Sequence, residues 1–244
     1  MPHGSPDWWG NIPSETVHGG LDTSELAVRL GSIVTFDRRG NVIFLDDFEG
    51  SLSSWIVAGG GASNAVYLGC EVTLQGSLAV VLHPGEENDG HASIRLIRPY
   101  PVLGGLGFEA AFVPQTNLKH VNLSLILYDG AQKHGYQTRY DHVNGQIKVQ
   151  ATGGTYPVVG TPGVQAEGYH NFCIMKLVVN CLTGQYERVL FNNHVYDASA
   201  HSVYTLPDEV TKPLMAAYIL VCNTGVYPVN VPVDCAIITQ NEPI

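Results

Sequence analysis

The stretch YHNFCIMKLVVNCLTGQYERVLFNNHVYD, residues 169–197, decides the fold. Residues 172–179 are mostly apolar and β-branched, and residues 180–184 are typical of a turn because Gly184 is free to adopt a positive φ. In residues 186–191 successive side chains alternate with a period of two. The pattern predicts two long strands with a turn between them, followed by a third short strand that begins at His194.

A hairpin with one apolar face is not stable alone in water, so we expect this hairpin to pack on a second sheet. Similar runs predict further strands near residues 42–45, 65–74, 77–83, 91–98, 106–113, 120–128, 134–141, 145–151, 214–223 and 231–239. The strand at 42–45 is expected to pair with another at 33–36. No helical pattern separates these runs, so we expect antiparallel sheets in a sandwich.

The composition limits the class of protein. The 244 residues include 27 Gly and 14 Pro, which suits many short strands joined by tight turns in one domain. The net charge of -10 indicates that neither nucleic acid nor an anionic membrane surface is the partner. No run approaches the roughly 18 apolar residues of a membrane span, and no signal peptide is visible.

The five cysteines form neither a zinc motif nor a disulfide framework, because their number is odd and no CxxC spacing occurs. Buried free thiols are therefore expected. A contact between Cys222 and Cys235 across a hairpin of the last two strands stays open as an alternative.

Residues 1–31 are expected to form an extended arm with one short helix at 23–30, and residues 32–244 the sandwich. Proline and glycine interrupt the arm, and Asp22 with Glu25 resembles a capping box before the helix. The arm is too apolar for a free tail, which indicates that it docks on a neighbouring subunit or folds back on its own domain. The residues expected to make this contact are Trp8, Trp9, Ile12, Leu26 and Leu30.

Several segments resemble the jelly rolls of the concanavalin A-like lectin/glucanase superfamily. The likeness lies in DDFEG (46–50), YDHVNGQI (140–147), KLVVN (176–180) and TGQYER (183–188), and it covers roughly residues 42–240. It implies an all-β, antiparallel sandwich. The superfamily includes lectins, glycosidases and proteins of virus particles, so the resemblance by itself does not choose a function.

The resemblance also implies a candidate metal site. In similar carbohydrate-binding modules a Glu after the first Phe and an Asp near the C-terminus hold a structural calcium ion. The matching positions here are Glu49 and Asp234, with Asp47 beside them. Calcium requires six or more oxygen ligands, so the alternative is that these are ordinary carboxylates at strand ends. No other cofactor is expected.

Tyrosines are the candidates for a sugar-binding platform, because an aromatic ring can stack on a sugar ring. They are Tyr136, Tyr140 and Tyr169, with Tyr156 as a further member. Tyrosine is also a common strand residue, so packing within the sheets is the alternative. A glycosidase needs two facing carboxyl groups, and no strand carries such a pair. No nucleophile motif occurs either.

From the sequence we therefore expect a non-enzymatic structural or attachment protein of a large assembly, such as the surface or decoration protein of a virion. Its partners would be copies of itself and other capsid proteins. The alternatives are a carbohydrate-binding module or lectin, placed outside the cell by a non-classical route, and a glycoside hydrolase. A virion protein with a lectin-like domain can also bind glycans.

Overall fold

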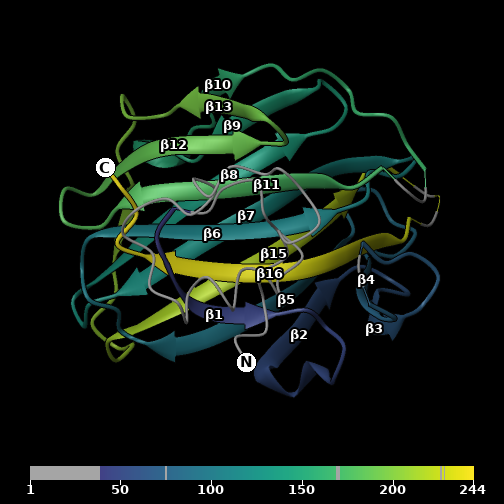
Figure 1. Ribbon diagram of the computed structural model, residues 1–244, viewed down its shortest axis with the longest axis horizontal. Helices are drawn as coiled ribbons and strands as arrows, with labels where there is room; N and C mark the ends of the chain where they lie inside the picture. The colour runs from purple at the N-terminus through teal and green to yellow at the C-terminus, as the bar shows by residue number, and fades with distance from the viewer. Residues whose placement is uncertain (1–38, 75, 169–170, 226, 228) are drawn as a thin grey trace, which may run out of the picture.

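The computed structural model describes residues 39–74, 76–168, 171–225, 227 and 229–244. In these residues the chain forms two antiparallel sheets that pack face to face (Figure 1), which confirms the predicted sandwich. The described helical segments are two short 3-10 turns, Leu52–Ser54 and Thr152–Gly154. Within the same ranges, no helix is long and apolar enough to cross a membrane.

Within the described part of the chain each sheet has eight strands. Sheet A contains, in spatial order, β13 (His194–Asp197), β12 (Gln185–Phe191), β11 (Cys173–Asn180), β6 (Gly105–Phe112), β16 (Val231–Gln240), β4 (Ala79–His83) and β3 (Ala65–Gly69), with β1 (Asn41–Asp46) beside β16. Sheet B contains β10 (Val158–Gly160), β9 (Gln146–Val149), β8 (Gln132–Asp141), β7 (Leu118–Tyr128), β15 (Leu214–Asn223), β5 (His91–Pro99) and β2 (Trp55–Gly60), with β14 (Tyr204–Pro207) beside β8.

The predicted hairpin forms as β11 and β12, and its third strand is β13. Asn180 shapes the turn, since its side-chain oxygen accepts hydrogen bonds from the backbone N–H groups of Leu182 and Thr183. Gly184 adopts a φ of 71°, in the left-handed region that favours glycine. The β11 strand also pairs with β6, so the hairpin lies inside sheet A and not at its edge.

The core lies between the two sheets. The inward side chains of β11, such as Leu177 and Val179, meet those of β7, such as Leu123 and Leu125. Aromatic rings fill the same layer, and Tyr140 stacks on Phe191 with ring centroids 4.7 Å apart. Burial of these apolar faces is what holds the two sheets together.

One predicted pairing is wrong. β15 and β16 follow each other in sequence but belong to different sheets, so they form no hairpin and Cys222 does not face Cys235 across one. The five cysteines are free thiols. The strand at 42–45 forms as β1 and pairs with β16, close to the C-terminus; its expected partner at 33–36 lies outside the described residues.

The arm, the helix at 23–30 and the assembly residues also lie outside the described residues. They are Trp8, Trp9, Ile12, Leu26 and Leu30. Among the described strands, β2, β10 and β14 were not predicted. The reason is physical, since β2 ends in Gly59-Gly60, β14 ends in Pro207 and β10 has three residues, and such edge segments carry weak strand signals.

A buried ion cluster ties the C-terminal segment to the outer side of sheet A. The fully buried ammonium of Lys176 lies 2.7 Å from Glu242 Oε1 and 4.0 Å from Glu109 Oε2. Arg188 Nη2 lies 3.0 Å from the other oxygen of Glu242, and the hydroxyl of Thr239 donates to Oε1. The carboxylate of Glu242 therefore binds one side chain from each of three strands, β11, β12 and β16.

Replacing Glu242 with Ala should lower the free energy of unfolding by about 3–5 kcal/mol, because the buried Lys176 and the half-buried Arg188 lose their shared carboxylate. Urea unfolding of the variant, followed by circular dichroism, measures this loss. Glu209→Ala is the control, since Glu209 is exposed. A loss no larger than that of the control would show that the cluster does not hold the C-terminal segment.

Candidate functional site

The outer face of sheet B carries polar side chains at its centre. In β7, Val121, Leu123 and Leu125 are buried between the sheets. Because side chains alternate along a strand, Asn122 and Ser124 point the other way. We define the sheet B face by seven residues that share this side of the sheet or lie against it: Arg95, Asn122, Ser124, Gln137, Arg139, Tyr156 and Tyr218.

Strand register arranges these side chains in rows that run across the strands. Residues directly opposite each other lie on the same face of a sheet. One row contains Arg95, Tyr218, Ser124 and Gln137, from β5, β15, β7 and β8. The next row contains Ser93, Leu220, Asn122, Arg139 and Lys148. A linear molecule laid across the strands would therefore meet about one polar group per strand, at the spacing of roughly 4.8 Å.

Arg139 is the most firmly placed residue of the sheet B face. Its Nε donates to the side-chain oxygen of Asn122 at 2.9 Å. Its guanidinium carbon lies 4.1 Å from the ring centroid of Tyr156, a cation–π contact. Gln137 Nε2 in turn donates to the hydroxyl of Tyr156 at 3.2 Å. The guanidinium is thus oriented before any ligand arrives.

Arg95 occupies the other end of the first row. Its Nη1 donates to the hydroxyl of Tyr218 at 3.2 Å, and its guanidinium carbon lies 5.7 Å from the centroid of the same ring. Arg95 and Tyr218 are half-buried, as is Arg139. Within the described residues, neither arginine forms an ion pair with a carboxylate.

His120 borders the sheet B face in the next row, opposite Cys222 and Asp141. Burial lowers the pKa of His120 to about 3, and the positive charges of Arg139 and Lys119 add to this effect. The imidazole is therefore neutral at physiological pH. Asp141 makes an ion pair with Lys148 at 2.6 Å, so its charge is locally balanced.

Of the predicted tyrosine platform, Tyr156 lies on this surface, whereas Tyr136 and Tyr140 do not. Tyr136 and Tyr140 are 1% and 0% exposed and point into the core, so no sugar ring can stack on them. Tyr136 packs edge to face on Tyr186, and Tyr140 packs on Phe191. Tyr169 lies outside the described residues. The alternation that turns the two tyrosines inward is what turns Gln137 and Arg139 outward.

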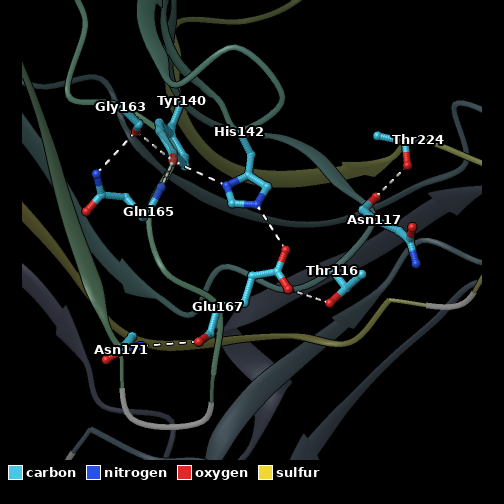
Figure 2. A network of polar contacts seen from close by, with 9 residues as sticks. All are labelled: Thr116, Asn117, Tyr140, His142, Gly163, Gln165, Glu167, Asn171 and Thr224. Carbon is cyan, nitrogen blue, oxygen red and sulfur yellow. Dashed lines mark hydrogen bonds and ion pairs between the residues drawn. The ribbon is translucent and has the colours of Figure 1, made fainter.

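The hydroxyl of Tyr140 belongs to a polar network at the edge of the sandwich (Figure 2). It accepts a hydrogen bond from the backbone N–H of Gln165 at 2.9 Å and lies 3.2 Å from Nδ1 of His142. Nε2 of His142 is 3.7 Å from Glu167, whose second oxygen accepts from the hydroxyl of Thr116. The order tyrosine, histidine, carboxylate is one that acid–base catalysis uses.

The environment of this network favours a structural role. Burial raises the pKa of Tyr140 to about 12, and burial lowers the pKa of His142 despite the nearby carboxylate of Glu167. Both groups are neutral at physiological pH and directed at protein partners. We interpret the network as a set of structural contacts that hold residues 163–167 against the end of β8.

Tyr136 borders a cavity of about 440 Å³ at one end of the sandwich, together with Cys181 and His134. Burial raises the pKa of Cys181 to about 12, so this thiol is protonated and a weak nucleophile. The ring nitrogens of His134 lie 3.1 Å from Asp129 and 3.3 Å from the hydroxyl of Thr205. These contacts satisfy both ring nitrogens of His134 from within the protein.

The three carboxylates predicted to hold calcium do not form a cluster. Oε1 of Glu49 accepts from the backbone N–H groups of Ser77 and Leu78 at 2.6 and 2.8 Å. Oδ2 of the buried Asp234 accepts from the N–H of Leu74 at 2.6 Å, and Asp47 caps its own turn. Among the described residues, no group of three or more acidic, histidine or cysteine side chains is arranged to hold a metal ion. The contacts that these carboxylates make within the described residues are those of loop anchors.

Comparisons with known proteins identify relatives by structure and not by sequence. No protein-family model and no curated protein matches the sequence. An endo-beta-1,4-glucuronan lyase from the fungus Trichoderma reesei matches with a TM-score of 0.56 and 10% identity, over 82% of this chain and 96% of the lyase. A Bacillus licheniformis beta-glucanase matches with a TM-score of 0.51 and 12% identity, over 81% and 98%. The potassium-bound carbohydrate recognition domain of Emp46p has a TM-score of 0.45 and 11% identity, over 82% and 94%. Identities this low establish the fold alone.

Replacing Glu49 with Ala should lower the Tm by the same amount in calcium and in a chelator, because the change removes two hydrogen bonds to the loop and no metal ligand. Thermal unfolding under both conditions measures this. Glu86→Ala is the control, since Glu86 is an exposed loop glutamate. A stabilisation by calcium that the variant loses would restore the metal interpretation.

The free energy of unfolding should decrease as the pH is lowered from about 6.5 to about 4.5. The reason is that His120 takes up a proton near pH 6.5 in the unfolded chain but only near pH 3 in the folded protein. Carboxyl groups contribute less to the pH dependence in this window, because they titrate mainly at lower pH. His120→Asn should flatten the dependence, measured by urea unfolding at a series of pH values. The exposed His91 provides the control, as His91→Asn. An equally steep dependence in His120→Asn would refute the assignment.

Proposed function

Because the chain has the concanavalin A-like lectin/glucanase fold, we propose that it is a carbohydrate-binding domain and that the sheet B face is its binding surface. The observation that carries this proposal is the fixed arginine at the centre of that face. Arg139 is held by Asn122 on one side and by the ring of Tyr156 on the other.

The chemistry of the sheet B face suits a sugar. Hydroxyl groups of a glycan need both donors and acceptors, and the half-buried amide of Gln137 offers both, beside Asn122 and Ser124, which are 5% and 7% exposed. These side chains project from strands, so little conformational entropy is lost when they bind. Tyr218 and Tyr156 add apolar area beside the polar groups, as in ligand sites that combine orientation with burial.

We propose binding without cleavage as the primary function. Two of the matching solved structures have TM-scores above 0.5 and are named as a glucanase and a lyase, so a direct test of enzymatic activity is needed. Hydrolysis of a glycosidic bond uses two carboxyl groups. Among the described strand residues of this face, Asp141 is the one carboxylate, and it is paired with Lys148.

The predicted role on a virion surface depends on the assembly residues within residues 1–31. That role stays a prediction, as does the location on a virion or outside the cell. Glycan binding by the sandwich is compatible with it and does not require it.

A glycan microarray should detect binding by the wild-type protein, and Arg139→Ala should weaken the affinity about 10- to 100-fold. The reason is that the variant loses hydrogen bonds from a charged donor, worth roughly 1.5–3 kcal/mol. Titration calorimetry with the best glycan measures the change. Mass spectrometry of the recovered glycan should show an unaltered chain length.

The matched control is Arg98→Ala, because Arg98 lies on the same strand as Arg95 but packs over the ring of Phe44. Its affinity should equal that of the wild type. Equal losses in Arg98→Ala and Arg139→Ala, or no binding to any glycan, would contradict the proposal. Shortened glycan products would replace it with an enzymatic function.

A further inference from the structure

Resting on the proposed glycan site, we infer that the ligand is an acidic polysaccharide whose sugar carboxylates bind to Arg95 and Arg139. The ligand class is a polymer that contains uronic acids. This inference names the chemistry of the ligand, which the fold leaves open.

The strand residues on the outer side of sheet B have the opposite charge to the chain as a whole. The chain contains 22 acidic and 12 basic residues, for a net charge of -10. The charged strand residues on the outer side of sheet B are four cations and one carboxylate. They are Arg95, Lys133, Arg139, Lys148 and Asp141. Cations gathered on one side of an acidic protein indicate an anionic partner there.

The two arginines retain their charge for a ligand. The single carboxylate, Asp141, is satisfied by Lys148 at 2.6 Å and by the side-chain amide of Asn144 at 2.8 Å. The neighbours of Arg139 are an amide and a phenol ring, and Arg95 donates to a tyrosine hydroxyl. All of these partners are neutral, so none of them cancels a guanidinium charge.

The geometry of each arginine favours a carboxylate over a hydroxyl. A guanidinium presents parallel N–H groups that match the two oxygens of a carboxylate. In Arg139 the interaction with Asn122 uses Nε, and the stack on Tyr156 fixes the plane. Half-burial lowers the local dielectric, which strengthens attraction to an anion relative to a fully exposed arginine.

The neutral state of His120 is consistent with the same positive field. The charges of Arg139 and Lys119 both lower its pKa, after the larger effect of burial. Asp141 and Asp89 act in the opposite direction and are outweighed. His120 therefore adds no positive charge of its own and can accept a hydrogen bond from a sugar hydroxyl.

The separation of the arginines indicates a polymer. Arg95 and Arg139 lie on β5 and β8, with β15 and β7 between them. Three strand spacings place β5 and β8 about 14 Å apart, and Arg139 also lies one row further along its strand than Arg95. One uronate cannot reach both, whereas two carboxylates on one chain can, with the half-buried Tyr218 contacting the sugars between them.

The test compares a polyuronate with the same polymer after chemical reduction of its carboxyl groups, and with a sulfated glycan of similar length. Titration calorimetry at low and at physiological salt gives the affinities. The polyuronate should bind at least 10-fold more tightly than its reduced form at physiological salt. Arg139→Gln and Arg95→Gln, which keep polar side chains of similar shape, should each lower that preference, and Arg98→Gln should not.

Each other outcome overturns a distinct statement. Equal affinity for the polyuronate and its reduced form would overturn the acidic ligand while the glycan site stands. Absence of binding to all three polymers would overturn both. The sulfated glycan could also bind as tightly as the polyuronate. If that binding were lost at physiological salt and unaffected by Arg139→Gln, it would reflect nonspecific charge attraction. That result would overturn the acidic-glycan site. Circular dichroism of each variant establishes that it is folded.

Discussion

The alternation of side chains along strands that are buried on one face is the constraint on which the whole structure depends. In β8, Tyr136, Thr138 and Tyr140 are buried between the sheets, so Gln137 and Arg139 have to face outward. A shift of the register by one residue would exchange the two sets. The apolar layer therefore fixes the core and, through the backbone, the position of every polar side chain on the opposite side.

Two tyrosine hydroxyls that enter the core are matched by partners at its border. The hydroxyl of Tyr140 reaches the segment 163–167, and that of Tyr186 donates to the carbonyl of Gln150 at 2.7 Å. On the outer side of sheet A, Lys176 is buried with Glu242. Because an unmatched buried group is costly, these contacts also select how the edge segments lie on the sandwich.

Local patterns predicted local structure well, as the hairpin of β11 and β12 shows, since alternation and turn chemistry are properties of neighbouring residues. Partners distant in sequence could not be derived in this way. The adjacency of β15 and β16 in sequence suggested a hairpin, but the chain crosses from one sheet to the other between them. Tyr136 and Tyr140 illustrate the limit for the site. The alternation in β8 was visible, but nothing local states which of its two faces meets the second sheet.

The charge distribution determines how such a surface can discriminate. At distances beyond the Debye length of about 8 Å, solvent screens individual charges, and the net charge of -10 repels polyanions that approach at random. Close to sheet B, the guanidinium groups of Arg95 and Arg139 dominate instead. The protein then attracts only a ligand that lies across the strands and brings its anionic groups within hydrogen-bonding distance of these two arginines. The acidity of the remaining surface thus contributes to specificity, because it penalises binding modes that do not use the two arginines.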